Sequence, residues 1–300
     1  MSELAKRHLF CFGLGYSVAC LAARLAGAGW TISGTSRSEG QAEKLRNLGY
    51  KMYVFDGSDP RPGDWFADVT HIVNSVPPGE ESISGQDPVL KHFADIISQL
   101  PMLRWLGYLS TTGVYGNTDG AWVDEMSPLS PSAIRSVKRM EVEMAWDKLA
   151  GAYNLPLHIF RLAGIYGPGR NVLNAALAGK APRVIKDGHQ FSRIHVEDIA
   201  KILEASMQKP NPGAIYNVCD DEPAAAADVT SYAYKLLGVR PTPKVFFEEA
   251  EASMSDMGRS FWKDNRRVHN DKVKKELEVQ LTYPTYRDGL KAIYKSDFSN

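Results

Sequence analysis

The chain contains few cysteines and no long apolar run. Its 300 residues include three cysteines, at positions 11, 20 and 219, which are too few and too scattered for a disulfide framework or a CxxC metal site. No window approaches the roughly 20 apolar residues that cross a bilayer. Basic and acidic residues balance at 35 each, so the chain lacks the positive field that attracts nucleic acid. We expect a cytoplasmic protein that binds no metal, nucleic acid or membrane.

Short β-type runs alternate with amphipathic segments in the first half of the chain. With 44% hydrophobic and 23% charged residues, the composition is typical of a globular protein. Strand-like runs lie at 9–12, 31–35, 52–55, 71–75, 105–110 and 157–161. Apolar residues at helical spacing lie at 17–26, 39–48, 88–100 and 136–149. This alternation predicts an α/β fold with a doubly wound parallel sheet covered on both faces.

The pattern changes after residue 165, where glycine and proline cluster at 166–169. Helix-like stretches follow at 172–178, 198–207, 224–237 and 271–277, and a strand-like run lies at 214–218. We expect residues 1–165 to form the domain of the large sheet, with about 195–220 completing that sheet. Residues 166–300 are expected to form a smaller C-terminal lobe.

A glycine-rich turn follows the first strand-like run. Residues 13–18 read Gly-Leu-Gly-Tyr-Ser-Val, a G-x-G-x-x-V variant of the dinucleotide-binding fingerprint. Gly13 would permit the tight turn, and Gly15 would let a pyrophosphate approach the start of the next helix, which Tyr16 and Ser17 begin. Val18 replaces the third glycine, so a purely structural turn is the alternative. The position between a strand and a helix favours a dinucleotide site.

The end of the second strand indicates which dinucleotide binds. NAD sites carry an acidic residue there that accepts hydrogen bonds from the ribose, but here Ser36, Arg37 and Ser38 precede the first carboxylate, Glu39. Arg37 would suit the 2′-phosphate of NADP, so we expect NADP rather than NAD. A solvated Arg37 is the alternative. Asp56, after the third strand, would accept from the adenine amino group or cap its own turn.

The turn after the fourth strand-like run contains two adjacent prolines in the sequence Asn-Ser-Val-Pro-Pro-Gly at 74–79. In doubly wound folds this turn passes the nicotinamide side of the cofactor. Ser75 and Pro77 would line that side. Alternatively, the prolines only end the strand.

Four segments resemble the extended short-chain dehydrogenases/reductases, which include nucleotide-sugar epimerases and dehydratases. They are Leu-Ser-Thr-Thr-Gly-Val-Tyr-Gly at 109–116, Arg-Leu-Ala-Gly-Ile-Tyr-Gly-Pro-Gly-Arg at 161–170, Ile-His-Val-Glu-Asp at 194–198 and Tyr-Asn-Val at 216–218. The resemblance implies a Rossmann-like doubly wound sheet, a smaller C-terminal substrate lobe and a small-molecule substrate between them. Arg170, the last residue of the second motif, is a candidate substrate-binding residue.

The acid/base pair of that family is missing. The family uses a tyrosine and a lysine four residues later, yet no tyrosine lies between positions 115 and 153. One alignment places Arg135 and Arg139 at these two positions, and a slip by one places Ile134 and Lys138 there. The pattern resembles an atypical extended subgroup. Arg135 and Arg139 share a helix face and could hold an anionic substrate and the cofactor ribose, or form a solvated helix edge.

Other residues are candidates for the catalytic work. The resemblance implies that the Thr111 hydroxyl binds the substrate carbonyl or alcohol. Thr112 and Gly113 replace the Asp and Glu of sugar dehydratases, which disfavours elimination of water, and Thr112 is assigned to substrate binding. Tyr115 and Tyr166 are substitute proton donors if the fold turns them into the cleft. Packing tyrosines are the alternative.

A basic cluster near the C-terminus belongs to the expected substrate lobe. Family members hold the substrate diphosphate with arginines of this lobe, so Arg266 or Arg267 could bind an anionic substrate. The neighbouring lysines are expected to form a solvated helix face.

Two functions from different classes remain open. The first is an NADP-binding oxidoreductase or epimerase-like enzyme that acts on a small or nucleotide-linked polar substrate. The second is a non-catalytic protein that senses NADP or binds a partner. Apolar helices at 88–100 and 136–149 could also pair in a homodimer.

Overall fold

The computed structural model describes residues 7–58, 60, 62–79 and 87–298. Its centre is a sheet of seven strands in the order β11-β7-β5-β4-β1-β2-β3. All neighbouring pairs in this sheet are parallel, which confirms the predicted doubly wound α/β fold. The strands are β1 His8–Phe12, β2 Thr31–Ser36, β3 Lys51–Val54, β4 His71–Asn74, β5 Trp105–Thr111, β7 Leu157–Leu162 and β11 Ile215–Val218.

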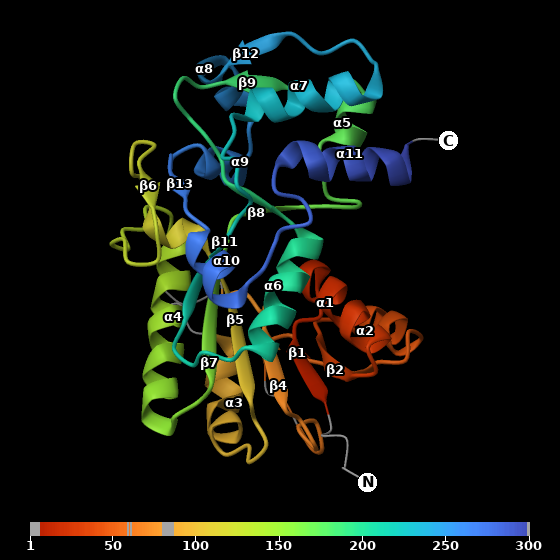
Figure 1. Cartoon of the computed structure of the whole chain (residues 1–300), viewed down its shortest axis with the longest axis vertical. Coiled ribbons are helices and arrows are strands. Elements are labelled where there is room, and N and C mark those ends of the chain that lie inside the picture. Colours follow the sequence, from red (N-terminus) through yellow and green to blue (C-terminus); the bar gives the residue numbers. More distant parts are fainter. Residues whose placement is uncertain (1–6, 59, 61, 80–86, 299–300) are drawn as a thin grey trace.

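Helices cover both faces of this sheet (Figure 1). One face packs against α1 Tyr16–Gly27, α2 Glu39–Arg46, α6 Val196–Gln208 and α10 Asp271–Leu277, and the other against α3 Pro88–Ser98 and α4 Ile134–Tyr153. The periodicity of α3 explains its placement, because Val89, Phe93 and Ile97 lie four residues apart and are buried. No helix among the described residues is long and apolar enough to span a membrane.

A second group of elements packs beyond the carboxyl ends of the strands. Helices α5 Leu173–Leu177, α7 Ala226–Leu237 and α11 Tyr286–Asp297 share a separate hydrophobic cluster. Three two-stranded pairs lie outside the large sheet: β8 Gly164–Tyr166 with β10 Arg193–His195, β9 Arg183–Ile185 with β12 Lys244–Phe246, and β6 Trp122–Val123 with β13 Arg267–Val268. Short helices α8 Phe247–Ala250, η2 Glu251–Ser253 and α9 Asp256–Phe261 follow β12.

The strand order places the functional region. β1 pairs with β2 on one side and with β4 on the other. Strands β2 and β3 therefore extend the sheet in one direction from β1, and β4 and the later strands extend it in the opposite direction. Ligands of open parallel sheets bind outside the carboxyl ends of strands at such a switch point. The glycine turn after β1 and the short helix η1 Thr112–Tyr115 after β5 both lie at this edge.

Candidate functional site

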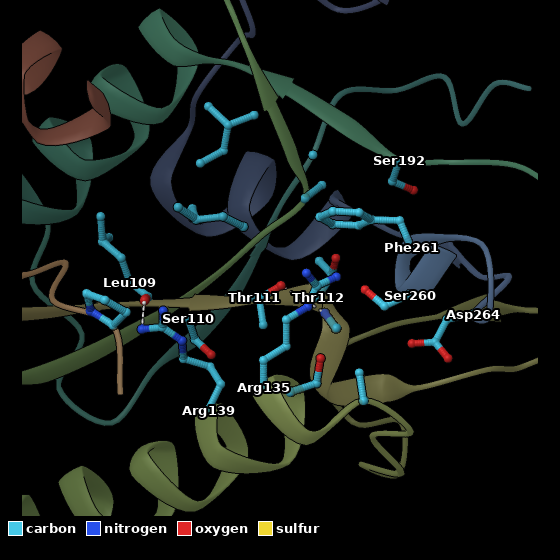
Figure 2. Close-up of a pocket in the computed structure, with 18 of the residues that line it drawn as sticks. Leu109, Ser110, Thr111, Thr112, Arg135, Arg139, Ser192, Ser260, Phe261 and Asp264 are labelled. Atoms are coloured by element: carbon cyan, nitrogen blue, oxygen red, sulfur yellow. Dashed lines mark hydrogen bonds between the residues drawn. The ribbon is translucent and has the colours of Figure 1, made fainter. Parts of the chain in front are cut away.

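A cavity of about 1200 Å³ lies at the carboxyl edge of the sheet. Its wall is formed by the β1–α1 turn, the ends of β4 and β5, the start of α4, and α9 with the residues that follow it. Figure 2 shows Arg135 and Arg139 extending from α4 toward this cavity, below Thr111 and Thr112 of β5 and η1. Segments far apart in the sequence therefore contribute to one site.

The glycine turn has the geometry of a pyrophosphate cradle. Gly13 has φ +75°, which favours glycine, and its N–H donates to Thr35 Oγ1 at 3.0 Å. Ser75 Oγ donates to the Gly13 carbonyl at 2.5 Å, so Ser75 positions the turn from the end of β4. Within the part of the chain that the structure describes, a Cβ at Gly15 would meet no atom within 4 Å, and no side chain caps α1. The free N–H groups of the first turn fit a phosphate group.

The first residues of α1 form part of the cavity wall. Tyr16 and Ser17 are both lining residues. Tyr16 Oη donates to the Pro168 carbonyl at 2.9 Å, and the guanidinium of Arg170 lies 5.8 Å from the centre of the Tyr16 ring. Arg170, expected to bind substrate, therefore stands beside the glycine turn, where a cofactor phosphate would lie. Pro77 lines the same cavity.

Three predicted adenosine contacts do not line the cavity, namely Ser36, Arg37 and Asp56. Ser36 is buried at the end of β2, and Arg37 is exposed and makes no hydrogen bond with any described residue. The nearest carboxylate, Glu39, pairs with Arg46. Asp56 Oδ1 accepts from the backbone and hydroxyl of Ser58, and these bonds hold the pKa of Asp56 below its usual value. Asp56 therefore caps its own turn, which is the alternative to an adenine contact.

The two arginines of α4 have different environments. Arg139 Nη1 donates to Tyr108 Oη at 3.0 Å and to the Leu109 carbonyl at 3.1 Å, so its head group is fixed at the end of β5 (Figure 2). Arg135 lies one turn earlier and is exposed. Its Cζ is 4.0 Å from the centre of the Phe261 ring. Arg139 is thus fixed at the end of β5, whereas Arg135 lies on the α9 side.

The hydroxyl groups at the end of β5 face the cavity. Thr111 lines it, and its Oγ1 accepts a hydrogen bond from the Gly113 N–H at 3.1 Å, which fixes the side chain. Thr112 also lines the cavity and is buried. Ser110, which the sequence reasoning had not singled out, lines it as well, and its buried Oγ has no hydrogen-bond partner in the described structure.

The two candidate tyrosines are turned away from the reaction space. Tyr115 is 1% exposed and does not line the cavity. Its hydroxyl donates to Asn217 Oδ1 at 2.7 Å and accepts from Arg161 at 2.9 Å, so it is a packing tyrosine. Tyr166 lines the cavity with its ring, but its hydroxyl donates to the Thr285 carbonyl at 3.4 Å. Burial raises the pKa of both phenols.

Arg266 lies at the far wall with a carboxylate partner that the sequence did not indicate. Its Nη1 donates to the Gly116 carbonyl at 2.9 Å and to Asp264 Oδ2 at 3.1 Å. Asp264 also accepts from the hydroxyl of Ser132, before α4. Burial lowers the pKa of Arg266, but the group stays charged at neutral pH.

The cavity is strongly cationic although the chain is neutral. Within the described residues its lining has six basic side chains and one carboxylate: Arg135, Lys138, Arg139, Arg170, Arg193 and Arg266, with Asp264. Such a wall favours a ligand that carries several negative charges. The part of the chain that the structure describes contains no group of three His, Cys, Asp or Glu side chains arranged to hold a metal ion.

Comparison with known proteins agrees with this geometry. The model of the NAD dependent epimerase/dehydratase family matches residues 15–219. The chain belongs to this family. It is 30% identical to Protein YeeZ of Escherichia coli K12 over 289 aligned residues. This alignment covers 91% of this chain and 94% of that protein.

Solved structures extend the likeness. A functionally unknown conserved protein from Silicibacter pomeroyi DSS is 48% identical, with a TM-score of 0.88 over 96% of this chain and 98% of that one. The dTDP-glucose 4,6-dehydratase of Bacillus anthracis, solved in complex with NAD, is 19% identical, with a TM-score of 0.77 over 98% of this chain and 97% of that chain. The second likeness shows the shared fold.

Proposed function

We propose that this family member is an NADP-dependent oxidoreductase or epimerase-like enzyme that acts on a small anionic substrate. The observation that carries the proposal is the cavity itself, in which an uncapped helix start beside Gly15 adjoins a wall with six cations and one carboxylate. The cofactor would supply or accept a hydride at its nicotinamide. We further propose that residues 1–165, with 195–220, hold this cofactor and that residues 166–300 complete the substrate side.

The preference for NADP rests on Arg37. Its guanidinium is exposed just beyond β2 and makes no hydrogen bond with a described residue, while Glu39 is engaged by Arg46. A ribose 2′-hydroxyl would find no carboxylate acceptor at this point, whereas a 2′-phosphate would find a charged donor. These contacts favour NADP over NAD.

The acid/base step requires a donor other than the family tyrosine. Thr111 lines the cavity, and we assign it the substrate oxygen. A guanidinium is a poor proton donor, so we do not assign the acid to Arg135. Water therefore supplies the proton, and the cationic wall stabilises negative charge on the substrate oxygen.

Fluorescence titration with NADPH and NADH tests the cofactor assignment. NADPH should bind more tightly than NADH, and Arg37→Asp should remove that preference. If NADH binds equally well and the variant changes nothing, the assignment to NADP is wrong. Arg240→Asp, an exposed arginine on the other lobe, is the matched control.

Hydride transfer is tested separately with NADPH deuterated at C4 and a panel of carboxylate-bearing carbonyl compounds. Deuterium in a product, detected by mass spectrometry, is the expected result. Tight NADPH binding without any transfer would instead favour the non-catalytic NADP-binding alternative.

A further inference from the structure

The cations of the cavity fall into two groups. Lys138 donates to the Gly79 carbonyl in the segment after β4, Arg139 donates to the Leu109 carbonyl of β5, and Arg170 stands over Tyr16 of α1. These three side chains surround the space that the glycine turn assigns to a dinucleotide. The remaining three cations, Arg135, Arg193 and Arg266, belong to the side of α9 and the upper lobe.

The head groups of two of these three cations already have partners within the protein. Arg266 pairs with Asp264. Arg193 is half-buried, and its Nη1 donates to the carbonyls of Phe191 and Ala224. A carboxylate engages the first guanidinium, and backbone carbonyls engage the second.

Arg135 differs from both. It makes no hydrogen bond or ion pair with a described residue, and the face of its guanidinium lies against the Phe261 ring. A guanidinium held by its face keeps the N–H donors along its edge available, in a fork that matches a carboxylate. Among the described cations of the substrate side, Arg135 is thus the one whose guanidinium has neither a hydrogen bond nor an ion pair.

Apolar and aromatic surface surrounds that charge. Phe261 is 54% exposed and Met257 is 65% exposed, although both line the cavity. Trp262 and Phe191 line the same wall, with ring centres 5.0 Å apart and planes at 89°. Large apolar side chains left this open mark a binding surface, because a ligand would remove them from water. The edge-on pair Trp262–Phe191 is suited to receive a third ring.

We propose that the substrate of this site is an aryl carboxylate, whose single negative charge binds the N–H edge of Arg135 and whose ring packs among Phe261, Trp262 and Phe191. This inference rests on the proposed function for the chemistry that follows binding. A nucleoside diphosphate carries two charged phosphates, whereas the described part of this wall offers one guanidinium that has neither a hydrogen bond nor an ion pair. Arg135, which one of the two alignments places at the position of the family tyrosine, becomes a specificity residue.

Calorimetric titration of the NADP-loaded protein tests the inference without requiring turnover. The probes are cinnamate, its neutral amide, hexanoate and UDP-glucose. We expect cinnamate to bind at least about tenfold more tightly than either cinnamamide or hexanoate, since one loses the charge and the other loses the ring. UDP-glucose should bind more weakly than cinnamate.

Variants separate this site from the cofactor site. Arg135→Gln should weaken cinnamate binding about tenfold and leave cinnamamide unchanged, whereas Arg240→Gln, at an exposed position after α7, should change neither. Phe261→Leu, which keeps an apolar side chain, should weaken both aromatic probes. NADPH affinity should be the same in all three variants, so failure of the cofactor assignment would be seen independently. Tighter binding of UDP-glucose than of cinnamate, or cinnamate binding insensitive to Arg135→Gln, would overturn the proposal.

Discussion

Arg161 of β7 and Glu143 of α4 form an ion pair in which both side chains are only 4% exposed, with Nη2 and Oε2 2.8 Å apart. The same guanidinium donates to the Tyr115 hydroxyl. The pair fixes α4 against the sheet, and α4 carries Arg135 and Arg139 into the cavity. The geometry of the site therefore depends on a charge pair that lies beneath it.

Loss of one member of this pair should be costly. Arg161→Met leaves the Glu143 carboxylate buried without its partner, and we expect the free energy of unfolding to fall by about 3–5 kcal/mol. Urea unfolding followed by circular dichroism measures the change. Arg24→Met, which removes a more exposed surface pair with Glu204, is the control and should have little effect. A similar small loss in both variants would contradict the structural role.

Gly15→Ala should separate folding from cofactor binding. The space around a Cβ at Gly15 is empty and its backbone is extended, so the free energy of unfolding should be unchanged. The methyl group would occupy the approach of the pyrophosphate, and the Kd for NADPH should rise about tenfold or more. Gly27→Ala, at the other end of α1 and also in open space, should leave the Kd unaltered. Unchanged affinity in Gly15→Ala would place the dinucleotide elsewhere.

Thr111→Val should reduce turnover while leaving cofactor affinity intact. The substitution keeps the side-chain volume and removes the hydroxyl that we assign to the substrate oxygen. Steady-state kinetics with a substrate found by deuterium transfer should show kcat lowered about a hundredfold. Because Thr111 Oγ1 also accepts from the Gly113 N–H, Thr111→Ser is the matched variant that restores both contacts. Full activity of Thr111→Val would exclude the assigned role.

Acid should destabilise the fold through its buried histidines. Burial lowers the pKa of His158 from 6.5 to about 4, and its Nε2 accepts the Asn211 N–H at 2.8 Å as a neutral ring. The unfolded chain takes up this proton below about pH 6.5, so stability is complete above that pH and falls as pH drops toward 4. The slope is about 1.4 kcal/mol per pH unit for each such histidine.

The measurement is urea unfolding at pH 7.5, 6.0 and 5.0. Burial also lowers the pKa of His71 and of His189 to about 4, so these two groups contribute to the slope together with His158. His158→Gln should remove the contribution of His158 to the slope of unfolding free energy against pH. A free energy of unfolding that stays constant between pH 7.5 and 5.0 would contradict this prediction.

Local patterns predicted the strand, glycine turn and helix at the start of the large sheet. The strand, glycine turn and helix around Gly13 and Gly15 span about 20 residues. Contacts between residues that are close in the sequence determine their order. Helix α11 was missed although Thr285 and Asp288 form a capping box at its start. Its many polar residues obscured the apolar positions Tyr286, Leu290 and Ile293, which are buried.

The substrate side could not be predicted because its contacts are distant in sequence. Phe261 meets Arg135 across more than a hundred residues, and Asp264 joins Ser132 across a similar distance. The hydroxyl of Tyr115 is used by Asn217, 102 residues away. No spacing rule signals such pairs, so the sequence left the role of this tyrosine open and gave no indication of Asp264.

The segment of α8, η2 and α9 contributes Met257 and Phe261 to the cavity, yet none of its helical residues is buried. Mutations there would leave the hydrophobic cores intact while reshaping what the cavity accepts. Substitutions in this stretch should therefore cost little folding stability. We expect proteins with this fold to differ in the substrates they accept first along residues 247–262.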